Sequence, residues 1–339
     1  MIKSKSETDI PDGYISAVNG SLIHIKGIEN VIKLHDLIKI SKHNILGEVI
    51  QIYSDYVVAQ CFENTTNLKI HDNVIGLNEA LSMELAPGLL GNIFDGIQRP
   101  LQEAFELFKG GGLKRGLEIP SLSRTREWHF KPLRKVKEKV SNGDIIGTVQ
   151  ETQSLSHKIM VPPGISGELT HIADEGNFTI IDEIFQIKVG NEEKTFSMLQ
   201  KWPIIKSRPF KERNLPNKPL ITGMRVIDLL FPITKGGTCG VPGGFGTGKT
   251  VIQQSLAKWC DADVVCFIGC GERGNEIADV LKQFTEIIDP RTGRPLLERI
   301  ILIANTSNMP VSAREASIFS GVTIAEYYRD MGYDVAVMA

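Results

Sequence analysis

The chain has 339 residues, with 38 lysines and arginines against 40 aspartates and glutamates, and a net charge of −2. This balance gives no general electrostatic attraction to nucleic acid or to anionic lipid. Apolar residues make up 42% of the chain, enough for two or three domain cores, and no apolar run is long enough to cross a bilayer. The N-terminus lacks the apolar segment of a signal peptide, so we expect a cytosolic protein with five reduced cysteines.

Short alternating β segments fill the region up to residue 75. Turn residues separate them, and the Asn19-Gly20 pair is a strong hairpin signal. Many short strands without an intervening helix predict a small β-barrel, assigned to residues 1–75. Because basic and aromatic residues are not clearly interleaved on one face, we interpret this barrel as a structural collar. The expected strands are residues 14–18, 21–26, 37–40, 46–53 and 56–62.

The next two segments differ in character. Residues 76–112 are rich in turns, contain one short helix from about Leu101 to Lys109, and are interpreted as a connector. Residues 113–200 are again β-rich and form an inserted domain, whose basic cluster at 124–139 is either a solvated face or a partner surface. The sequence around Lys158 is similar to the lysine hairpin of biotinyl and lipoyl carriers, and both a modified lysine and a purely structural hairpin fit it.

The last segment, residues 201–339, begins with a linker rich in proline and basic residues. It continues as an alternation of strands and helices, which predicts a mostly parallel sheet flanked by helices. Its elements are expected at residues 225–230, 264–269 (strand), 276–284 (helix), 300–304 (strand), 312–331 (helix) and 334–338 (strand).

The sequence at 243–250 fits the phosphate-loop pattern G-x-x-x-x-G-K-[ST]. A short strand is expected before it at 236–241 and a helix after it at 251–260, which gives the strand–loop–helix order of a polyphosphate site. Lys249 would contact the β- and γ-phosphates, and the Thr250 hydroxyl would hold the accompanying Mg²⁺. The alternative is a glycine-rich turn before an ordinary helix. The expected nucleotide-binding residues are Gly243, Gly244, Phe245, Gly246, Thr247, Gly248, Lys249, Thr250 and Val251.

A second motif follows the strand at 264–268. In parallel sheets ligands bind at the carboxyl ends of strands, so Glu272 is placed to face the γ-phosphate. Hydrolysis of a nucleoside triphosphate needs a carboxylate that orients water and a cation near the developing charge, which suits Glu272 and Arg273. The alternative is that Glu272 or Glu276 only caps the next helix.

Taken together, these motifs resemble the catalytic A subunit of V/A-type rotary ATPases over essentially the whole chain. The resemblance rests on the phosphate loop, the Gly-Glu-Arg-Gly-Asn-Glu run at 271–276, and the segments 288–295 and 304–310. It extends to 86–101, 127–130 and 157–164. It implies an α/β fold with an N-terminal small β-barrel, an inserted β-rich domain and a RecA-like P-loop core. The inserted domain favours this family over F-type β subunits and flagellar export ATPases.

The resemblance also implies the setting in which the chain works. It implies alternating A and B subunits in a hexameric ring with central rotor and peripheral stalks, cytoplasmic and peripheral to a membrane. ATP hydrolysis or synthesis, with ATP or ADP and Mg²⁺, is then coupled to H⁺ or Na⁺ passage through a separate membrane sector. Lys249, Glu272 and Arg273 carry the catalytic roles, and Arg314 is a candidate for a phosphate or interface contact or is an ordinary surface arginine. No nucleic acid is expected as a partner.

Two departures from the family pattern affect the interpretation. Thr247 stands where eukaryotic relatives tend to carry a cysteine, so redox control of the loop is unsupported. The sequence stops at Ala339, where the family would next place its Walker B aspartate, so we expect a truncated chain that does not sustain turnover alone. The alternative is a nucleotide-dependent or structural assembly module. A Rho-like helicase fits neither the near-neutral charge nor the barrel.

Overall fold

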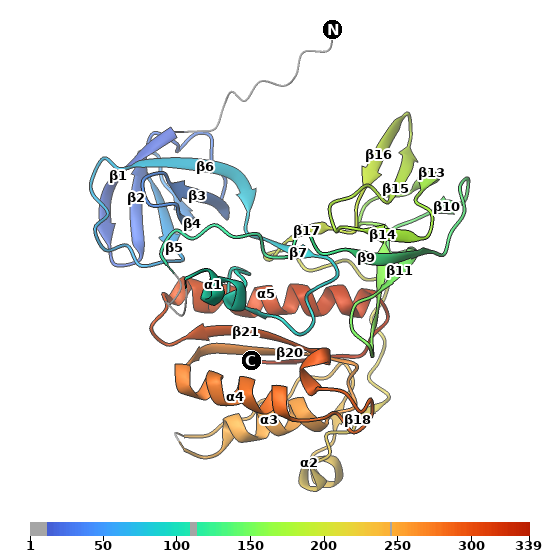
Figure 1. Ribbon diagram of the computed structural model, residues 1–339. Helices are drawn as coiled ribbons and strands as arrows, with labels where there is room; N and C mark the ends of the chain where they lie inside the picture. Colours follow the sequence, from blue (N-terminus) through green and yellow to red (C-terminus); the bar gives the residue numbers. More distant parts are fainter. Residues whose placement is uncertain (1–11, 109–113, 245) are drawn as a thin grey trace.

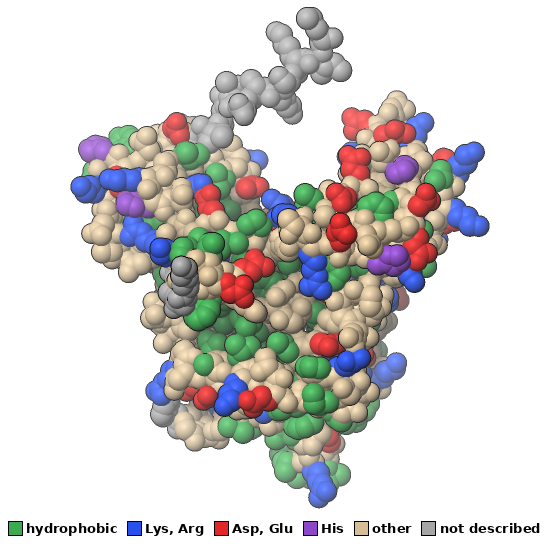
Figure 2. Space-filling model, in the orientation of Figure 1, with side chains coloured by type: hydrophobic (Ala, Val, Ile, Leu, Met, Phe, Trp, Pro, Cys, Tyr) green, Lys and Arg blue, Asp and Glu red, His purple; other side chains and the backbone are tan. Residues whose placement is uncertain are grey.

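The structure is a computed structural model that describes residues 12–108, 114–244 and 246–339. Three regions surround one long helix, α5 (Val311–Asp330): a β-barrel, a β-rich region, and a sheet flanked by helices beneath both (Figure 1). The barrel and the β-rich region stand apart at the top of the molecule, with an open notch between them (Figure 2). The α/β-with-barrel fold class expected from the sequence is confirmed.

The N-terminal region is a closed six-stranded barrel in the order β1-β2-β5-β4-β3-β6. Its core is built from inward-facing aliphatic residues such as Ile23, Ile25 and Ile40, which alternate with half-buried neighbours as a closed sheet requires. The last barrel strand runs beyond residue 75. The barrel strands are β1 (Asp12–Asn19), β2 (Leu22–Lys26), β3 (Asp36–Ile40), β4 (Ile45–Ile52), β5 (Val57–Cys61) and β6 (Asn73–Ala80).

The chain that leaves the barrel reaches both other regions. β7 (Ser82–Leu85) pairs with β17 (Gln200–Pro203), so the chain entering and the chain leaving the β-rich region lie side by side. β8 (Ile93–Phe94) then joins the sheet of the C-terminal region, and α1 (Leu101–Leu107) follows it. The predicted connector therefore contributes a strand to the C-terminal sheet, a pairing that local sequence does not reveal.

The β-rich region consists of two four-stranded sheets. Their strand orders are β10-β13-β15-β16 and β12-β11-β9-β14, with antiparallel pairing throughout. The strands are β9 (Trp128–Pro132), β10 (Lys139–Val140), β11 (Ile145–Gln150), β12 (Ser156–Met160), β13 (Gly167–Ile172), β14 (Gly176–Phe178), β15 (Phe185–Val189) and β16 (Glu192–Phe196).

The C-terminal sheet is parallel, in the order β22-β20-β21-β8. Residues of β20 alternate between two cores: Val264, Cys266 and Ile268 pack in the cluster that contains α5, whereas Val265 and Phe267 pack in the cluster that contains α3 and α4. Burial on both faces explains why these strands are continuous apolar runs. The elements are α3 (Lys249–Trp259), β20 (Val264–Glu272), α4 (Gly274–Glu286), a 3₁₀ turn (Leu296–Arg299), β21 (Ile300–Thr306) and β22 (Val335–Met338).

The segment before the phosphate loop lacks one predicted strand and carries a short helix with exposed apolar side chains. The strand expected at 236–241 does not form, and in the described chain this segment pairs with no strand. Before it, the chain forms β18 (Pro219–Leu220), α2 (Arg225–Leu230) and β19 (Ile233–Thr234). Val226, Leu229 and Leu230 of α2 are exposed, at the lower end of the molecule in Figure 2, a surface that the described chain leaves uncovered. Within the described ranges no helix is long and apolar enough to span a membrane.

Candidate nucleotide site

The glycine-rich loop before α3 has the backbone that close approach to a ligand requires. Gly246 and Gly248 have φ angles of 76° and 85°, in the left-handed region that favours glycine. The Thr247 hydroxyl donates to the Gly244 carbonyl at 2.9 Å, and a side chain at Gly243 would collide with that hydroxyl. The loop leads directly into α3, whose first N–H groups have no partner within the helix. Phe245 lies outside the described residues.

The residues that end the loop begin α3. Lys249 is exposed, and its Nζ donates to the Gly243 carbonyl oxygen at 2.7 Å, so the ammonium group curls back over the loop. Thr250 is half-buried in the first turn of α3, and the Val251 side chain is 63% exposed beside it. A cation, a hydroxyl and the positive end of an eleven-residue helix therefore meet at one place, which is the chemistry of an anion site.

Glu272 ends the neighbouring strand β20. The strand's pairing with β21 shifts register between Cys270 and Glu272, and Gly271 lies there with a φ of 79°. Burial raises the pKa of the Glu272 carboxyl, and a hydrogen bond and like charge from Glu276 raise it further, while Lys249 lowers it. The structure thus brings Glu272 and Lys249, 23 positions apart in sequence, into electrostatic contact.

Arg273 and Glu276 lie where α4 begins. Arg273 is exposed at the N-cap position, and Glu276 lies in the first helical turn, where an acidic side chain interacts favourably with the helix dipole. Neither residue makes a side-chain capping bond at this terminus. A hydrogen bond between the carboxyl groups of Glu276 and Glu272 contributes to the raised pKa of Glu272.

Arg314, in the first turns of α5, lies over the turn that precedes Glu272. A side chain at Gly271 would contact Arg314 Cδ at 3.1 Å. The Arg314 carbonyl accepts hydrogen bonds from the Cys270 thiol at 3.1 Å and the Ser317 hydroxyl at 2.5 Å. The side-chain Nε of Arg314 is buried and has no hydrogen-bond partner among the described residues. Arg314 therefore supports the end of β20 rather than lying free on the surface.

Two other sequence hypotheses concern metals and lysine modification. Within residues 12–108, 114–244 and 246–339, no group of three or more His, Cys, Asp or Glu residues is arranged to hold a metal ion. Lys158 lies within β12, half-buried, and its Nζ donates to the Met331 carbonyl at 2.5 Å while lying 4.7 Å from the centre of the Tyr333 ring. A lysine engaged in this way is not presented at a hairpin tip, so the structure favours the structural interpretation.

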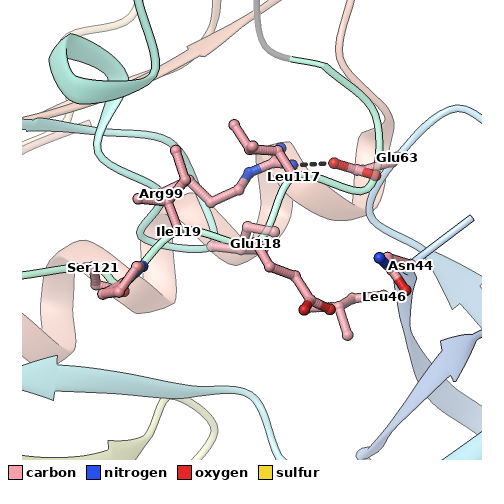
Figure 3. Close-up of a pocket in the computed structure, with 10 residues that line it drawn as sticks. Asn44, Leu46, Glu63, Arg99, Leu117, Glu118, Ile119 and Ser121 are labelled. Atoms are coloured by element: carbon pink, nitrogen blue, oxygen red, sulfur yellow. Dashed lines mark hydrogen bonds and ion pairs between the residues drawn. The ribbon is translucent and has the colours of Figure 1, made fainter. Parts of the chain in front are cut away.

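A separate hollow of about 440 Å³ lies between the barrel and the segment 117–121 (Figure 3). Its charged groups are already paired: Arg99 contacts Glu63 and also donates to Asp95 at 2.7 Å, and Lys39 contacts Glu118. Figure 3 shows the Glu63–Arg99 contact at the wall of the hollow. Because these groups satisfy one another, the hollow is a joint between regions and offers no spare charge to a ligand.

Comparison with known families identifies all three regions of the chain. The ATP synthase alpha/beta family nucleotide-binding domain matches residues 223–339, the alpha/beta subunit barrel-sandwich domain matches 119–205, and the alpha/beta family beta-barrel domain matches 15–87. These matches follow the order of the three regions in the structure.

Curated relatives are similar along nearly the whole chain. The A subunit of the A-type ATP synthase of Methanopyrus kandleri is 53% identical over 328 residues, which is 96% of this chain and 55% of that protein. The V-type ATP synthase alpha chain 1 of Clostridium tetani is 49% identical over 331 residues, 98% of this chain and 55% of that protein. The chain thus spans about half the length of the relatives it matches.

A solved structure shares the fold. The assembled ATPase EscN from the type III secretion system of enteropathogenic E. coli superposes with a TM-score of 0.58 at 20% identity. The match covers 96% of this chain and 55% of that one. At this identity the likeness concerns the fold alone.

Proposed function

Because the chain belongs to the ATP synthase alpha/beta family, we propose that it is the nucleotide-binding part of a catalytic A subunit of a V/A-type rotary ATPase. The A-type relative from Methanopyrus kandleri and the V-type relative from Clostridium tetani are 53% and 49% identical to it. The whole assembly would hydrolyse or make ATP and couple that reaction to the transport of H⁺ or Na⁺.

The observation that carries this proposal is the meeting of Lys249 with Glu272 at the carboxyl end of β20. Lys249 would bind the β- and γ-phosphates together with the backbone N–H groups of the loop. Glu272 would accept a hydrogen bond from the attacking water and orient it toward the γ-phosphorus. The pKa of the Glu272 carboxyl is shifted upward, the direction that favours a general base, and Arg273 would stabilise charge on the γ-phosphate.

The protein groups around the loop fit an Mg²⁺ ion that arrives with the nucleotide. Mg²⁺ retains several waters and binds through one or two protein oxygens plus phosphate oxygens, so a dedicated cage is not required. The Thr250 hydroxyl would be such a ligand, within reach of the phosphates held by the loop. Bound there, the ion would neutralise charge that develops on the phosphate oxygens.

The partners follow from the same premise. The chain would alternate with B subunits in a hexameric ring, around a central rotor and beside a peripheral stalk. It would lie in the cytoplasm and reach the membrane only through the ion-translocating sector. The division into a collar (1–75), a connector (76–112), an inserted domain (113–200) and a nucleotide-binding domain (201–339) remains part of this proposal.

Nucleotide binding by the 339-residue chain is the first test. Lys249→Ala removes charge-assisted contacts to phosphate, so ATP affinity should fall by roughly tenfold to a hundredfold. Lys258→Ala is the matched control, because Lys258 lies at the other end of α3 and donates to Gln283 Oε1 at 2.6 Å. Isothermal titration calorimetry with Mg²⁺ and ATP measures the ATP affinity of both variants. Equal affinity in Lys249→Ala and the unmodified chain would contradict the proposed site.

The catalytic role of Glu272 needs a complete ring with its partner subunits. There, Glu272→Gln should leave ATP affinity within about threefold and lower turnover by about a hundredfold or more, since the amide neither takes up a proton nor orients water as a base. Phosphate release and ATP binding are measured on the same preparation. Undiminished turnover would remove Glu272 from the mechanism while leaving the nucleotide site intact.

A further inference from the structure

A glutamate of the β-rich region, outside every motif described above, is buried at the centre of the molecule. Glu151 follows β11 and is 6% exposed. Its Oε1 accepts hydrogen bonds from the backbone N–H groups of Gly88, Leu89 and Leu90 at 2.7, 2.9 and 3.1 Å. One carboxylate oxygen thus orders the loop that leads to β8.

The same carboxylate binds the C-terminal part of α5. Tyr328 donates its hydroxyl to Glu151 Oε2 at 2.9 Å, and His157 Nδ1 lies 2.6 Å from the same oxygen. His157 Nε2 lies 2.9 Å from the Tyr327 hydroxyl. Burial alone raises the pKa of Glu151, but His157 and the backbone N–H groups of Leu90 and Gly88 lower it, and the net shift is downward. Glu151 is therefore an ionised, fully hydrogen-bonded carboxylate.

Other contacts attach the same end of α5 to its surroundings. Lys158 donates to the Met331 carbonyl, and the Tyr333 hydroxyl donates to the Ser156 carbonyl at 2.5 Å. Arg208, 2% exposed, donates from Nε to Asp330 Oδ2 at 2.6 Å. The C-terminal end of α5 is thus bound on several sides by the β-rich region and the linker that follows it.

The middle of α5 packs too closely on β20 to slide. Gly321 faces Ile268, and a Cβ at this position would lie 2.8 Å from Ile268 Cγ1 and collide with its terminal methyl. The Ser320 hydroxyl donates to the Gly96 carbonyl at 2.6 Å. Because α5 and β20 cannot slide past each other, a shift at one end of α5 would displace the helix together with β20, the strand that ends in Glu272.

The N-terminal end of α5 contacts the nucleotide site. Arg314 lies over Gly271, directly before Glu272. Arg314 and Tyr328 are 14 positions apart, which corresponds to about 21 Å along an α-helix. A contiguous path of packed groups therefore runs from Glu151 through α5 to the residue proposed to orient water.

We propose that Glu151 is a positioning residue that, through Tyr327, Tyr328 and α5, couples the β-rich region to the Glu272 end of the nucleotide site. The proposal rests on the proposed function, because it assumes that nucleotide binds at the phosphate loop. A role in stability alone does not require a charge here, since apolar side chains can replace buried ion pairs without loss. Directional hydrogen bonds, by contrast, fix one relative position of loop, helix and domain.

Coupling is reciprocal, so nucleotide binding at the loop should tighten the Glu151 contacts. Hydrogen exchange of the 339-residue chain is measured with and without a non-hydrolysable ATP analogue and Mg²⁺. In the unmodified chain the analogue should slow exchange in peptides covering 246–256 and also in those covering 86–92. Tyr328→Phe removes one hydroxyl from Glu151, and should abolish the second effect while keeping the first.

Nucleotide affinity supplies the second readout. Tyr328→Phe should weaken binding of the analogue by about threefold to fivefold, the value of one net hydrogen bond. Tyr53→Phe is the matched control, since the Tyr53 hydroxyl donates only to the exposed Gln51 at 3.0 Å. If Tyr328→Phe fails to fold, Tyr327→Phe, which removes the partner of His157 Nε2, is used with the same expectations.

The outcomes separate this proposal from the function on which it rests. If the analogue protects 246–256 but leaves 86–92 unchanged in the unmodified chain, the coupling is wrong and the nucleotide site stands. Unaltered affinity in both tyrosine variants would overturn it equally. If the analogue protects neither segment, the proposed function and the coupling fall together.

Discussion

Two glutamates near opposite ends of α5 have opposite electrostatic surroundings. Glu151 is fully buried, yet its pKa is lowered, because His157 and backbone N–H groups supply more stabilisation than burial removes. Glu272 is only half-buried, yet its pKa is raised, because burial and Glu276 both oppose its charge. Depth of burial alone therefore does not decide the direction of the pKa shift; the hydrogen-bond partners do.

The comparison separates a structural carboxylate from one that is proposed to be reactive. The Glu151 carboxylate has its acceptor capacity used by protein donors, so it has none left for a ligand. Glu272 has Glu276 as a like-charged neighbour, and among the described residues Lys249 favours its ionised form. A carboxyl held in this way gains most from an arriving proton, water or cation, which is the environment expected at a functional site.

Removal of the Glu151 side chain should produce the largest effect on stability. Glu151→Ala leaves three backbone N–H groups, the Tyr328 hydroxyl and His157 Nδ1 without their partner. This loss should lower the free energy of unfolding by about 3–5 kcal/mol. Glu175→Ala removes an exposed glutamate of the same region, paired with His129 at 3.0 Å, and should cost much less stability, because water screens an exposed pair. Urea unfolding measures both, and similar losses would remove the contrast between the buried and exposed ion pairs.

A smaller loss is expected where α5 rests on β20. Gly321→Ala favours the helix by about 1 kcal/mol but overpacks Ile268 at a cost of about 1–3 kcal/mol, so a net loss of up to about 2 kcal/mol is expected. Gly274→Ala, also in a helix, meets nothing closer than 4.0 Å and should change stability by less than about 0.5 kcal/mol. Equal urea midpoints for the two variants would show that a methyl group at position 321 fits between α5 and β20 without strain.

The sequence predicts the elements whose signals are local. The phosphate loop, α3, β20, α4, β21 and α5 follow from glycine spacing, apolar runs and helical periodicity, and each forms within a few residues of its expected place. The strand expected at 236–241 is wrong: in the described chain this segment has no ladder pairing, and a strand is defined by pairing that local propensity does not supply. β8 is not predicted, for the converse reason: two residues of a turn-rich segment become a strand only because they pair with β21.

The residues of the Glu151 network are equally invisible in the sequence. Glu151 lies six positions before His157 but 177 positions before Tyr328, and no local signal marks it as a partner of either residue. Only the packing of α5 against the β-rich region brings them together. The nucleotide site could be predicted more completely, because its residues are grouped within two short runs whose spacing itself reflects the chemistry of phosphate binding.

The finest test of the comparison concerns the effect of Glu276 on the pKa of Glu272. Glu276→Gln removes the like charge that helps to raise the pKa of Glu272, so this pKa should move down toward the ordinary value for glutamate while burial keeps it somewhat high. A group whose pKa is raised in the folded state stabilises the fold below its unfolded value, and this contribution is lost as pH rises through the folded pKa. The variant should therefore lose less stability than the unmodified chain as pH rises from acid toward neutral.

Carbon-13 carboxyl titration follows Glu272 directly, with Glu286→Gln at the far end of α4 as the control. If the titration of Glu272 does not move in Glu276→Gln, the raised pKa of Glu272 comes from burial alone.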